Sequence, residues 1–359
     1  MKNIITEILI KLGNIYFKNK KEKPTEINRI LIIAPIGIGD VLMTTPAIRA
    51  LRNKFPKSVT IDCLMHEWGK EVLQDNPYIN NILINNKIYK NHSLFELVKE
   101  AKKYKNYDCA IVFSHLFLPI FAYLCKIPIR LGYDKNGEGF ALTRKSQYLN
   151  NKHKLDLNLD VVKLLGATVI NKKMDFFFKK GSVNLPKNTI GVCVGGGVNP
   201  GVKMPQKIWN TEGFAFVCNA LIKKGYEIVF LGSIDDVALT KDVIKILYNK
   251  EKIINYTGKT DLKKAAEIIS QCKLFLCNDS ALMHLAAAVD TLVVALFGPT
   301  DPGVLAPLGR KHIYIQGKID KSKFKNSEIV EDYYNHKYIN SIQKEDVLKI
   351  IEEKLISLK

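Results

Sequence analysis

Two successive series of alternating strand and helix patterns constrain this 359-residue chain more than any other feature. In the first series, apolar runs at 29–35, 59–65, 81–85, 107–113 and 129–132 predict strands, and the stretches 42–55, 92–104 and 116–126 predict helices. In the second, strands are predicted at 189–194, 226–231, 252–256, 273–277 and 291–296, with helices at 211–224, 235–249, 261–271, 280–288 and 343–357. Such alternation is typical of parallel βαβ units. The sequence therefore predicts an α/β protein with two open units, in which ligands bind at the carboxyl ends of the strands.

A basic connector at 179–188, which contains Pro186, separates the two series. We expect a basic amphipathic helix and linker at 1–27, one domain at 28–183 and a second domain at 184–359. A chain of this length also favours two domains over one.

The charge balance points to an anionic partner. The net charge is +19, from 54 Lys and Arg against 35 Asp and Glu, which favours a nucleic acid, an acidic membrane surface or a phosphorylated substrate. No nucleic-acid-reading motif is present, so we expect no nucleic-acid partner. Seven cysteines are scattered without a C-x-x-C pair, and this is typical of reduced core residues in a cytoplasmic protein without a disulfide framework or zinc site.

The first twenty residues predict an amphipathic helix. One helical face carries Ile4, Ile5, Ile8, Leu12, Ile15 and Tyr16, and positive charge comes from Lys2, Lys11, Lys18 and Lys20. Such a helix either lies on an anionic membrane surface or packs on its own domain, and the sequence leaves both open. No run is long enough to span a bilayer, and Glu7 and Lys11 argue against a signal peptide.

Asp40 ends a glycine turn that follows the first strand, Gly37-Ile-Gly39-Asp40. A carboxylate at the start of a helix is an N-cap in its ordinary interpretation. The turn also matches part of the dinucleotide motif G-x-G-x-x-G, but Leu42 occupies the third glycine position. An NAD or FAD site is therefore disfavoured.

A second motif, Asn278-Asp279-Ser280 followed by His284, comes where the strand 273–277 ends. Asp279 or Ser280 can cap the next helix, whose free N–H groups could receive a phosphate. His284 lies one turn further on the same face, and a structural and a functional role remain equally open.

A third segment, Gly195-Gly-Gly-Val-Asn-Pro-Gly201, follows the first strand of the second series and leads to Lys207. Its glycines permit close backbone approach to a ligand. Lys207 is either a surface lysine in a flexible loop or a phosphate contact.

Together these segments resemble glycosyltransferase family nine, the ADP-heptose:lipopolysaccharide heptosyltransferases. The resemblance spans about residues 28–350. It is also carried by Thr44 to Arg52, Arg130 to Tyr133, His153 to Gly166, Lys207-x-Trp209 with Glu212 and Phe214, Thr257-Gly-Lys-Thr260 and Phe297-Gly-Pro-Thr-x-Pro302.

The resemblance implies a GT-B fold, with two Rossmann-like domains whose parallel sheets face an interdomain cleft. It implies an inverting transferase without a bound metal or other cofactor, in which Asp40 is the general base on an acceptor-side domain. The implied donor-binding residues are Gly39, Lys207, Thr260, Asp279, Ser280, Ala281 and His284, and Asp235 and Asp236 are candidate ribose contacts. Many family members carry glycine at the position of Ala281, so the approach to its backbone N–H is tighter here.

The expected partners are a nucleotide-sugar donor, ADP-heptose first, an anionic lipid-linked saccharide acceptor and an anionic membrane surface. We expect a cytoplasmic protein at the inner face of the inner membrane. The alternatives are a same-fold glycosyltransferase that uses another nucleotide sugar, and a non-catalytic nucleotide- or glycan-binding module. The carboxylate of Asp40 argues against the latter, since a pure binding protein needs no base.

Overall fold

The computed structural model describes residues 2–17, 26–90, 94–114, 117–181, 183–199, 202–309, 311–324, 328–330 and 332–357. The predicted basic linker at 19–24 and the pair Pro200-Gly201 lie outside these ranges. The chain divides into two compact units, Met1–Lys172 and Lys173–Lys359, which we describe separately.

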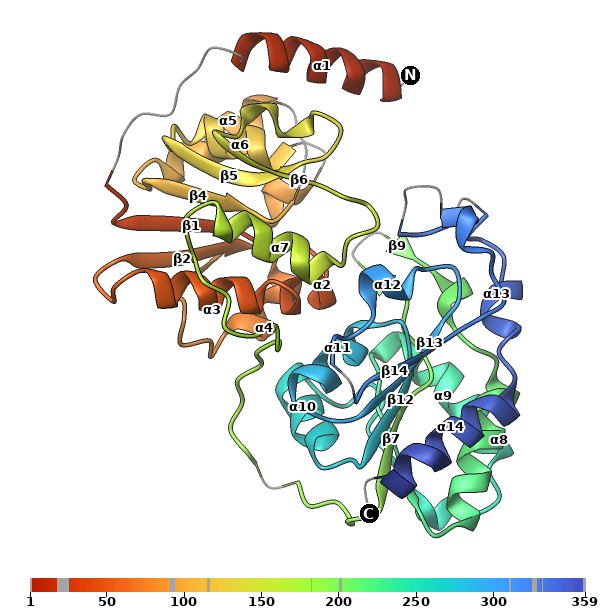
Figure 1. Cartoon of the computed structure of the whole chain (residues 1–359). Coiled ribbons are helices and arrows are strands. Elements are labelled where there is room, and N and C mark those ends of the chain that lie inside the picture. Colours follow the sequence, from red (N-terminus) through yellow and green to blue (C-terminus); the bar gives the residue numbers. More distant parts are fainter. Residues whose placement is uncertain are drawn as a thin grey trace. The chain divides into compact units, whose positions relative to one another are not determined.

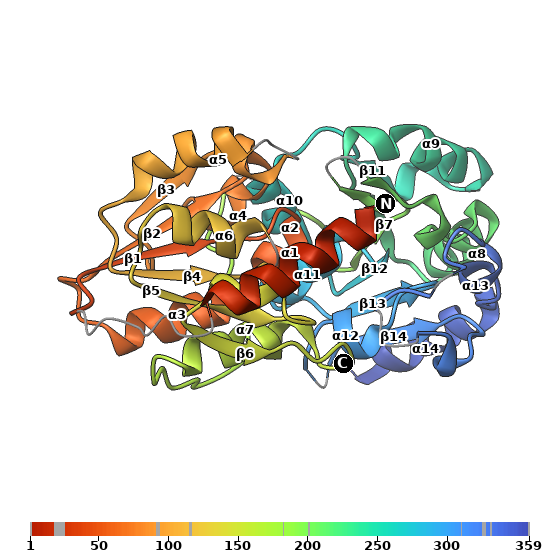
Figure 2. The same ribbon diagram turned by 90° about the horizontal axis from the view of Figure 1, so that it is seen from above.

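Unit 1 is built on a six-stranded parallel sheet with the order β3-β2-β1-β4-β5-β6 (Figures 1 and 2). Its strands are β1 (Arg29–Ile33), β2 (Thr60–Met65), β3 (Asn81–Ile84), β4 (Cys109–Val112), β5 (Ile129–Asp134) and β6 (Arg144–Gln147). β1 pairs with β2 on one side and with β4 on the other. The chain thus reverses its direction of winding between β1 and β4, and ligands bind at the carboxyl ends of strands at such a switch point.

Helices cover both faces of this sheet. The unit contains α1 (Lys2–Phe17), α2 (Ile38–Leu42), α3 (Thr45–Lys54), α4 (Lys70–Leu73), α5 (Leu94–Ala101), α6 (Phe117–Leu124) and α7 (Lys154–Lys163). Strand β1 is buried along its apolar run, and Leu31 and Ile33 pack with α5 and α6 residues in one core cluster. α3 and α7 pack against each other. The predicted helix 42–55 is instead two helices, because Met43 and Thr44 interrupt it between α2 and α3.

Helix α1 packs on its own unit, against the short 3-10 helix Glu138–Ala141 and against Tyr123 of α6. Phe17 makes an edge contact with the ring of Tyr123, with centroids 4.7 Å apart, and the Asn14 amide donates to the Gly137 carbonyl at 3.2 Å. Three residues of the predicted apolar stripe point elsewhere, since Ile8, Leu12 and Ile15 are between 50% and 73% exposed. Tyr16 of that stripe reaches the unit, because its hydroxyl lies 3.3 Å from the hydroxyl of Tyr123. The helix therefore packs through one face and leaves a second apolar face uncovered by described residues.

Unit 2 repeats the same architecture, with the strand order β11-β10-β7-β12-β13-β14. Its parallel strands are β7 (Thr189–Cys193), β10 (Glu227–Phe230), β11 (Ile253–Asn255), β12 (Leu274–Asn278), β13 (Val293–Phe297) and β14 (Ile313–Gln316). A small antiparallel pair, β8 (Val198–Asn199) and β9 (Val202–Lys203), follows β7. Here the switch point lies between β7 and β12, which pair in register at Cys193 and Cys277.

The helices of unit 2 also cover both faces of its sheet (Figures 1 and 2). They are α8 (Thr211–Lys223), α9 (Val237–Ile246), α10 (Leu262–Ser270), α11 (Ala281–Ala288), α12 (Pro302–Leu305), α13 (Lys337–Asn340) and α14 (Lys344–Ser357). α8 packs against α9 and α14, and α10 packs against α11. Trp209 and Phe214 anchor the core beneath α8. All seven cysteines are free and buried, as predicted.

The boundary between the two units falls after Lys172, earlier in the sequence than the predicted boundary at 183/184. The segment from Lys173 onward belongs to unit 2, because that unit holds it: the backbone N–H of Val183 donates to Glu267 at 2.9 Å, and that of Leu185 donates to Gln271 at 3.0 Å.

Candidate active site

Asp40 lies at the switch point of unit 1, just beyond the carboxyl end of β1. Helix α2 begins at Ile38, and its N-cap is Gly37 in an extended conformation. The N-cap prediction for Asp40 is therefore wrong, because Gly37 starts the helix earlier and Asp40 follows Gly39 in its first turn. The Asp40 side chain is 38% exposed, and its Oδ1 lies 3.2 Å from Nζ of Lys154, the first residue of α7.

At the switch point of unit 2, Asn278 joins three segments. Its side chain is fully buried. Its amide nitrogen donates to the carbonyls of Val194 and Gly195 at 2.8 and 3.0 Å, and its Oδ1 accepts from the backbone N–H of Trp209 at 3.1 Å. The end of β12 is thereby tied to the glycine loop and to the segment that carries Lys207.

Lys207 and Asp279 form an almost buried ion pair at this edge. The distance from Nζ to Oδ2 is 2.7 Å, and the side chains are 13% and 7% exposed. Thr300 donates its hydroxyl to the same oxygen at 2.8 Å. Burial raises the pKa of Asp279, but Lys207, Thr300 and His284 outweigh it and hold the pKa below its ordinary value. Asp279 is thus an anion that holds Lys207 in place.

The N-terminus of α11 opens beside this ion pair. Ser280 is the N-cap, its side chain makes no capping hydrogen bond, and Ala281 is the first helical residue. His284 is buried one turn further on. Gly196 has φ of 120°, and a Cβ there would stand 2.8 Å from the Cβ of Ser280. Only glycine lets the loop after β7 approach the helix so closely.

The two candidate ribose contacts have different surroundings. Asp236 is buried, and its oxygens accept from the backbone N–H groups of Gly196 at 3.1 Å and Ser233 at 2.7 Å. Asp235 is 45% exposed and lies 3.5 Å from Nζ of Lys203. Asp236 therefore shapes the glycine loop, and Asp235 is the better placed of the two to meet a ligand.

Thr260 is half-buried in the turn after β11, next to Asp261, which caps α10. Six of the predicted donor residues thus gather at the carboxyl edge of unit 2: Lys207, Thr260, Asp279, Ser280, Ala281 and His284. Gly39 and Asp40 lie in unit 1.

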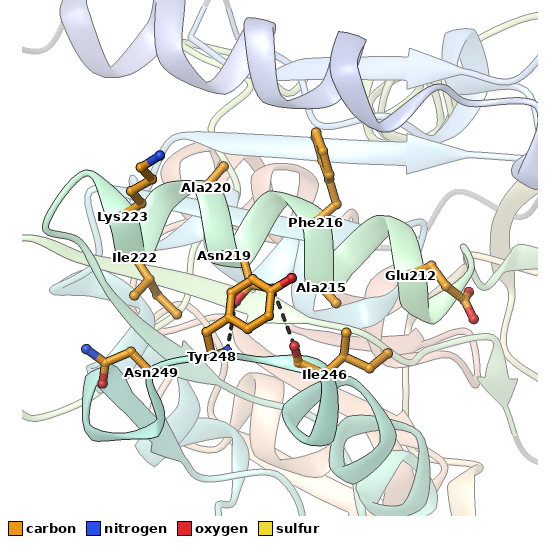
Figure 3. Close-up of a pocket in the computed structure, with 10 residues that line it drawn as sticks. All are labelled: Glu212, Ala215, Phe216, Asn219, Ala220, Ile222, Lys223, Ile246, Tyr248 and Asn249. Carbon is orange, nitrogen blue, oxygen red and sulfur yellow. Dashed lines mark hydrogen bonds between the residues drawn. The ribbon is translucent and has the colours of Figure 1, made fainter.

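A cavity of about 690 Å³ lies elsewhere in unit 2, between α8 and the segment that follows α9 (Figure 3). Asn219 spans it, since its amide donates to the Ile246 carbonyl at 3.4 Å and its oxygen accepts from the Tyr248 N–H at 3.1 Å. None of the predicted site residues lines this cavity.

The family model for glycosyltransferase family 9 (heptosyltransferase) matches residues 95–334. The chain belongs to this family.

Curated relatives extend the match over most of the chain. Lipooligosaccharide heptosyltransferase 2 of Haemophilus ducreyi is 28% identical over 341 residues, which cover 85% of this chain and 94% of that protein. Lipopolysaccharide heptosyltransferase 2 of Escherichia coli K12 is 26% identical over 336 residues, with 85% and 93% covered. The predicted glycosyltransferase family is confirmed.

Solved structures agree on the fold. A glycosyl transferase family 9 protein of Veillonella parvula has a TM-score of 0.80 at 24% identity and covers 94% of this chain and 100% of its own. The E. coli ADP-heptose lps heptosyltransferase II has a TM-score of 0.72 at 22% identity, with 92% and 99% covered. The predicted GT-B fold, with two Rossmann-like units of parallel strands, is confirmed.

The described residues offer neither a metal-binding cluster nor a membrane-spanning helix. In those ranges no group of three or more His, Cys, Asp and Glu side chains could hold a metal ion, and no helix has both the length and the apolar character to cross a membrane.

Sequence reasoning missed the roles of Lys154, Thr300 and Asn278. Asn278 and Thr300 stand in motifs that carry the family resemblance, so a signal for them existed. Lys154 also stands in such a stretch, His153 to Gly166, but the sequence could not pair it with Asp40, because the two residues are 114 positions apart in the chain.

Proposed function

We propose that this glycosyltransferase moves heptose from ADP-heptose to a hydroxyl of a lipopolysaccharide inner-core or related saccharide, with inversion at the anomeric carbon. The observation that carries the proposal is the Lys207 ammonium held beside the N-terminus of α11. A fixed cation and free helix N–H groups at a switch point are what a diphosphate requires. The names of the relatives supply the sugar and the acceptor class.

In the proposed reaction an acceptor hydroxyl oxygen attacks the anomeric carbon of heptose. The bond from that carbon to the β-phosphate oxygen breaks, and ADP leaves. Asp40 takes the hydroxyl proton, and Lys207 with the N–H groups at Ser280 and Ala281 stabilises the charge that develops on the diphosphate. The chemistry requires both half-sites, one in each unit, to act on the same donor and acceptor. No metal or other cofactor is part of this proposal.

The role of Asp40 is tested with Asp40→Asn, which keeps size and removes the basic group. Turnover of ADP-heptose should fall by about 10²–10⁴-fold, the usual contribution of a general base, while ADP binding stays intact. Near-normal turnover in the variant would remove Asp40 from this role. Transfer from a UDP- or GDP-sugar but not from ADP-heptose would move the enzyme to the alternative donor class.

The donor site is tested by calorimetric titration with ADP. Lys207→Met should weaken ADP binding by about 1–3 kcal/mol, the scale of a hydrogen bond to a charged group. Lys245→Met is the matched control, because this exposed lysine pairs only with Asp242 in its own helix among the described contacts. Equal ADP affinity in wild type and Lys207→Met would contradict the assignment.

We also propose that the uncovered face of α1 holds the enzyme at the cytoplasmic face of the inner membrane, where a lipid-linked acceptor is found. Ile8, Leu12 and Ile15 are each at least half exposed on that face, while Gly13, Asn14 and Phe17 pack against the unit. The net charge of +19 complements an anionic lipid surface.

Vesicle sedimentation tests this second proposal. Vesicles that contain anionic lipid should retain wild type at low ionic strength and release much of it at high ionic strength. The double variant Leu12→Ser/Ile15→Ser should bind less. Tyr248→Ser is the control, because Tyr248 is 90% exposed in unit 2. Equal retention of the α1 variant and wild type would place the contact elsewhere.

A further inference from the structure

Lys154 occupies an unfavourable position within its own helix. It is the first residue of α7, where the helix dipole favours anions over cations. The N-cap is His153, whose ring accepts from the backbone N–H of Leu155 at 3.2 Å. A cation at this position is stabilised from outside the helix. The carboxylate of Asp40, 3.2 Å from Nζ of Lys154, supplies that stabilisation.

The next turn of α7 also contacts α2. Asn158 follows Lys154 by four residues and so lies on the same helical face. Its amide nitrogen donates to the carbonyl of Met43, the C-cap of α2, at 2.9 Å. Its oxygen accepts from the buried hydroxyl of Tyr133. One face of α7 thus holds both the carboxylate that projects from α2 and the backbone at the end of α2.

Helix α2 needs such support. It has five residues, Ile38–Leu42, and so short a helix is not stable on its own. An aspartate that is 38% exposed would also be free to change rotamer. General-base catalysis depends on orientation, and a small misplacement of the base lowers the rate strongly.

We propose that Lys154 is the positioning residue for Asp40. Its ammonium holds Oδ1 and thereby fixes the carboxylate, so that Oδ2 is the oxygen that receives the acceptor proton. This inference rests on the proposed role of Asp40 as general base. It gives α7 a function in the reaction that neither the glycine turn nor the donor residues provide.

A different role would leave a different kinetic signature. If Lys154 bound an anionic group of the acceptor directly, its loss would raise KM for the acceptor whether or not Asp40 is present. A positioning residue acts through Asp40, so its loss lowers kcat, leaves both KM values unchanged and has no effect once the carboxylate is gone.

The test compares Lys154→Met, Lys154→Arg and Lys152→Met in the full-length enzyme. Lys154→Met should lower kcat by about tenfold or more, with KM for donor and acceptor within about twofold of wild type. Lys154→Arg should restore most of the rate, because a guanidinium can make the same ion pair. Lys152→Met is the matched control, since Lys152 lies just before α7 and pairs with Asp160 of that helix and not with Asp40. This variant should leave kcat unchanged.

The same substitution in the Asp40→Asn background completes the test. Asp40→Asn/Lys154→Met should be as slow as Asp40→Asn alone. A further loss in that background, a raised acceptor KM, or a normal kcat in Lys154→Met would each overturn the positioning role. Normal turnover in Asp40→Asn would instead overturn the base assignment itself. Thermal unfolding identifies any variant that fails to fold. If Lys154→Met does not fold, the kcat and KM values of Lys154→Arg decide whether Lys154 is a positioning residue.

Discussion

Asp279 places a negative charge where the proposed diphosphate would bind, and its contacts explain why that charge is tolerated. Its Oδ2 receives hydrogen bonds from both Lys207 and Thr300. The carboxylate is therefore neutralised from within the protein, and it fixes the direction of the Lys207 ammonium. The motif Asn278-Asp279-Ser280 predicted this location from sequence. It could not predict the ion pair, because Lys207 and Asp279 are 72 residues apart in the chain.

The substitution Asp279→Asn tests this role. It removes the charge but keeps the size, so Lys207 loses its buried counter-ion. We expect a loss of about 1–3 kcal/mol in unfolding free energy, the scale of a charged hydrogen bond, together with weaker ADP binding. Urea denaturation and calorimetry measure the two effects. Asp242→Asn, at an exposed ion pair, is the control; unchanged stability in Asp279→Asn would show that Lys207 needs no partner.

Among the secondary structure elements, those with a continuous apolar pattern were predicted well from sequence. The central strands β1, β7 and β12 and the final helix α14 lie within two residues of their predicted positions. Strand β6 was not predicted, because its sequence Arg-Lys-Ser-Gln has no apolar pattern and only Ser146 is buried. Helix α1 was predicted, but the face that packs was not. The contact depends on Phe140 and Tyr123, which come together only in the folded unit.

The packing of α1 is tested with Gly13→Leu. A Cβ at this position would stand 2.5 Å from the ring of Phe140, so the variant should release the helix. An isolated helix of 16 residues is marginal in water, and trypsin should then cleave faster after Lys11. Leu12→Ser, on the exposed face, should leave the cleavage rate unchanged. Equal rates in Gly13→Leu and wild type would mean that the contact contributes nothing to holding α1.

For the whole molecule, the chain passes from contacts with unit 1 to contacts with unit 2 between two consecutive residues, Lys172 and Lys173. Arg49 of unit 1 donates to the carbonyl of Asn171 at 3.1 Å, and Lys172 pairs with Asp156 of the same unit at 2.6 Å. The next residue, Lys173, pairs with Asp290 of unit 2 at 2.9 Å. The sequence predicted this boundary later in the chain, because the basic stretch 179–188 with Pro186 resembles a linker. In the structure that stretch belongs to unit 2, where Glu267 accepts a hydrogen bond from the backbone of Val183.

The pair at Asp290 has a definite pH dependence. Hydrogen bonds from Lys311 and Lys173 lower the pKa of Asp290 to about 2, below the value of about 3.9 in an unfolded chain. The ionised carboxylate therefore stabilises the fold above about pH 4, and this contribution is lost as the pH falls toward about 2. Because the side chain is 60% exposed, solvent screening limits the contribution to about 1 kcal/mol or less.

We expect Asp290→Asn to be slightly less stable than wild type at pH 7, and we expect the difference to shrink between pH 4 and pH 3. Urea denaturation at the three pH values measures it. A difference that stays constant across this range would assign the effect to packing and not to the ionised carboxylate.

The single amide of Asn278 has a consequence for anyone who wishes to re-engineer the enzyme. This side chain binds the carbonyls of Val194 and Gly195 and the N–H of Trp209. The glycine loop and the segment that carries Lys207 are therefore held together as one structural unit. Because these partners are backbone groups, a chimera that takes its loop from another transferase keeps them only if the new loop follows the same backbone path. A loop of another shape would leave the buried amide of Asn278 without partners, and that chimera should fold poorly. Donor preference is therefore best exchanged by transplanting both segments together with the asparagine.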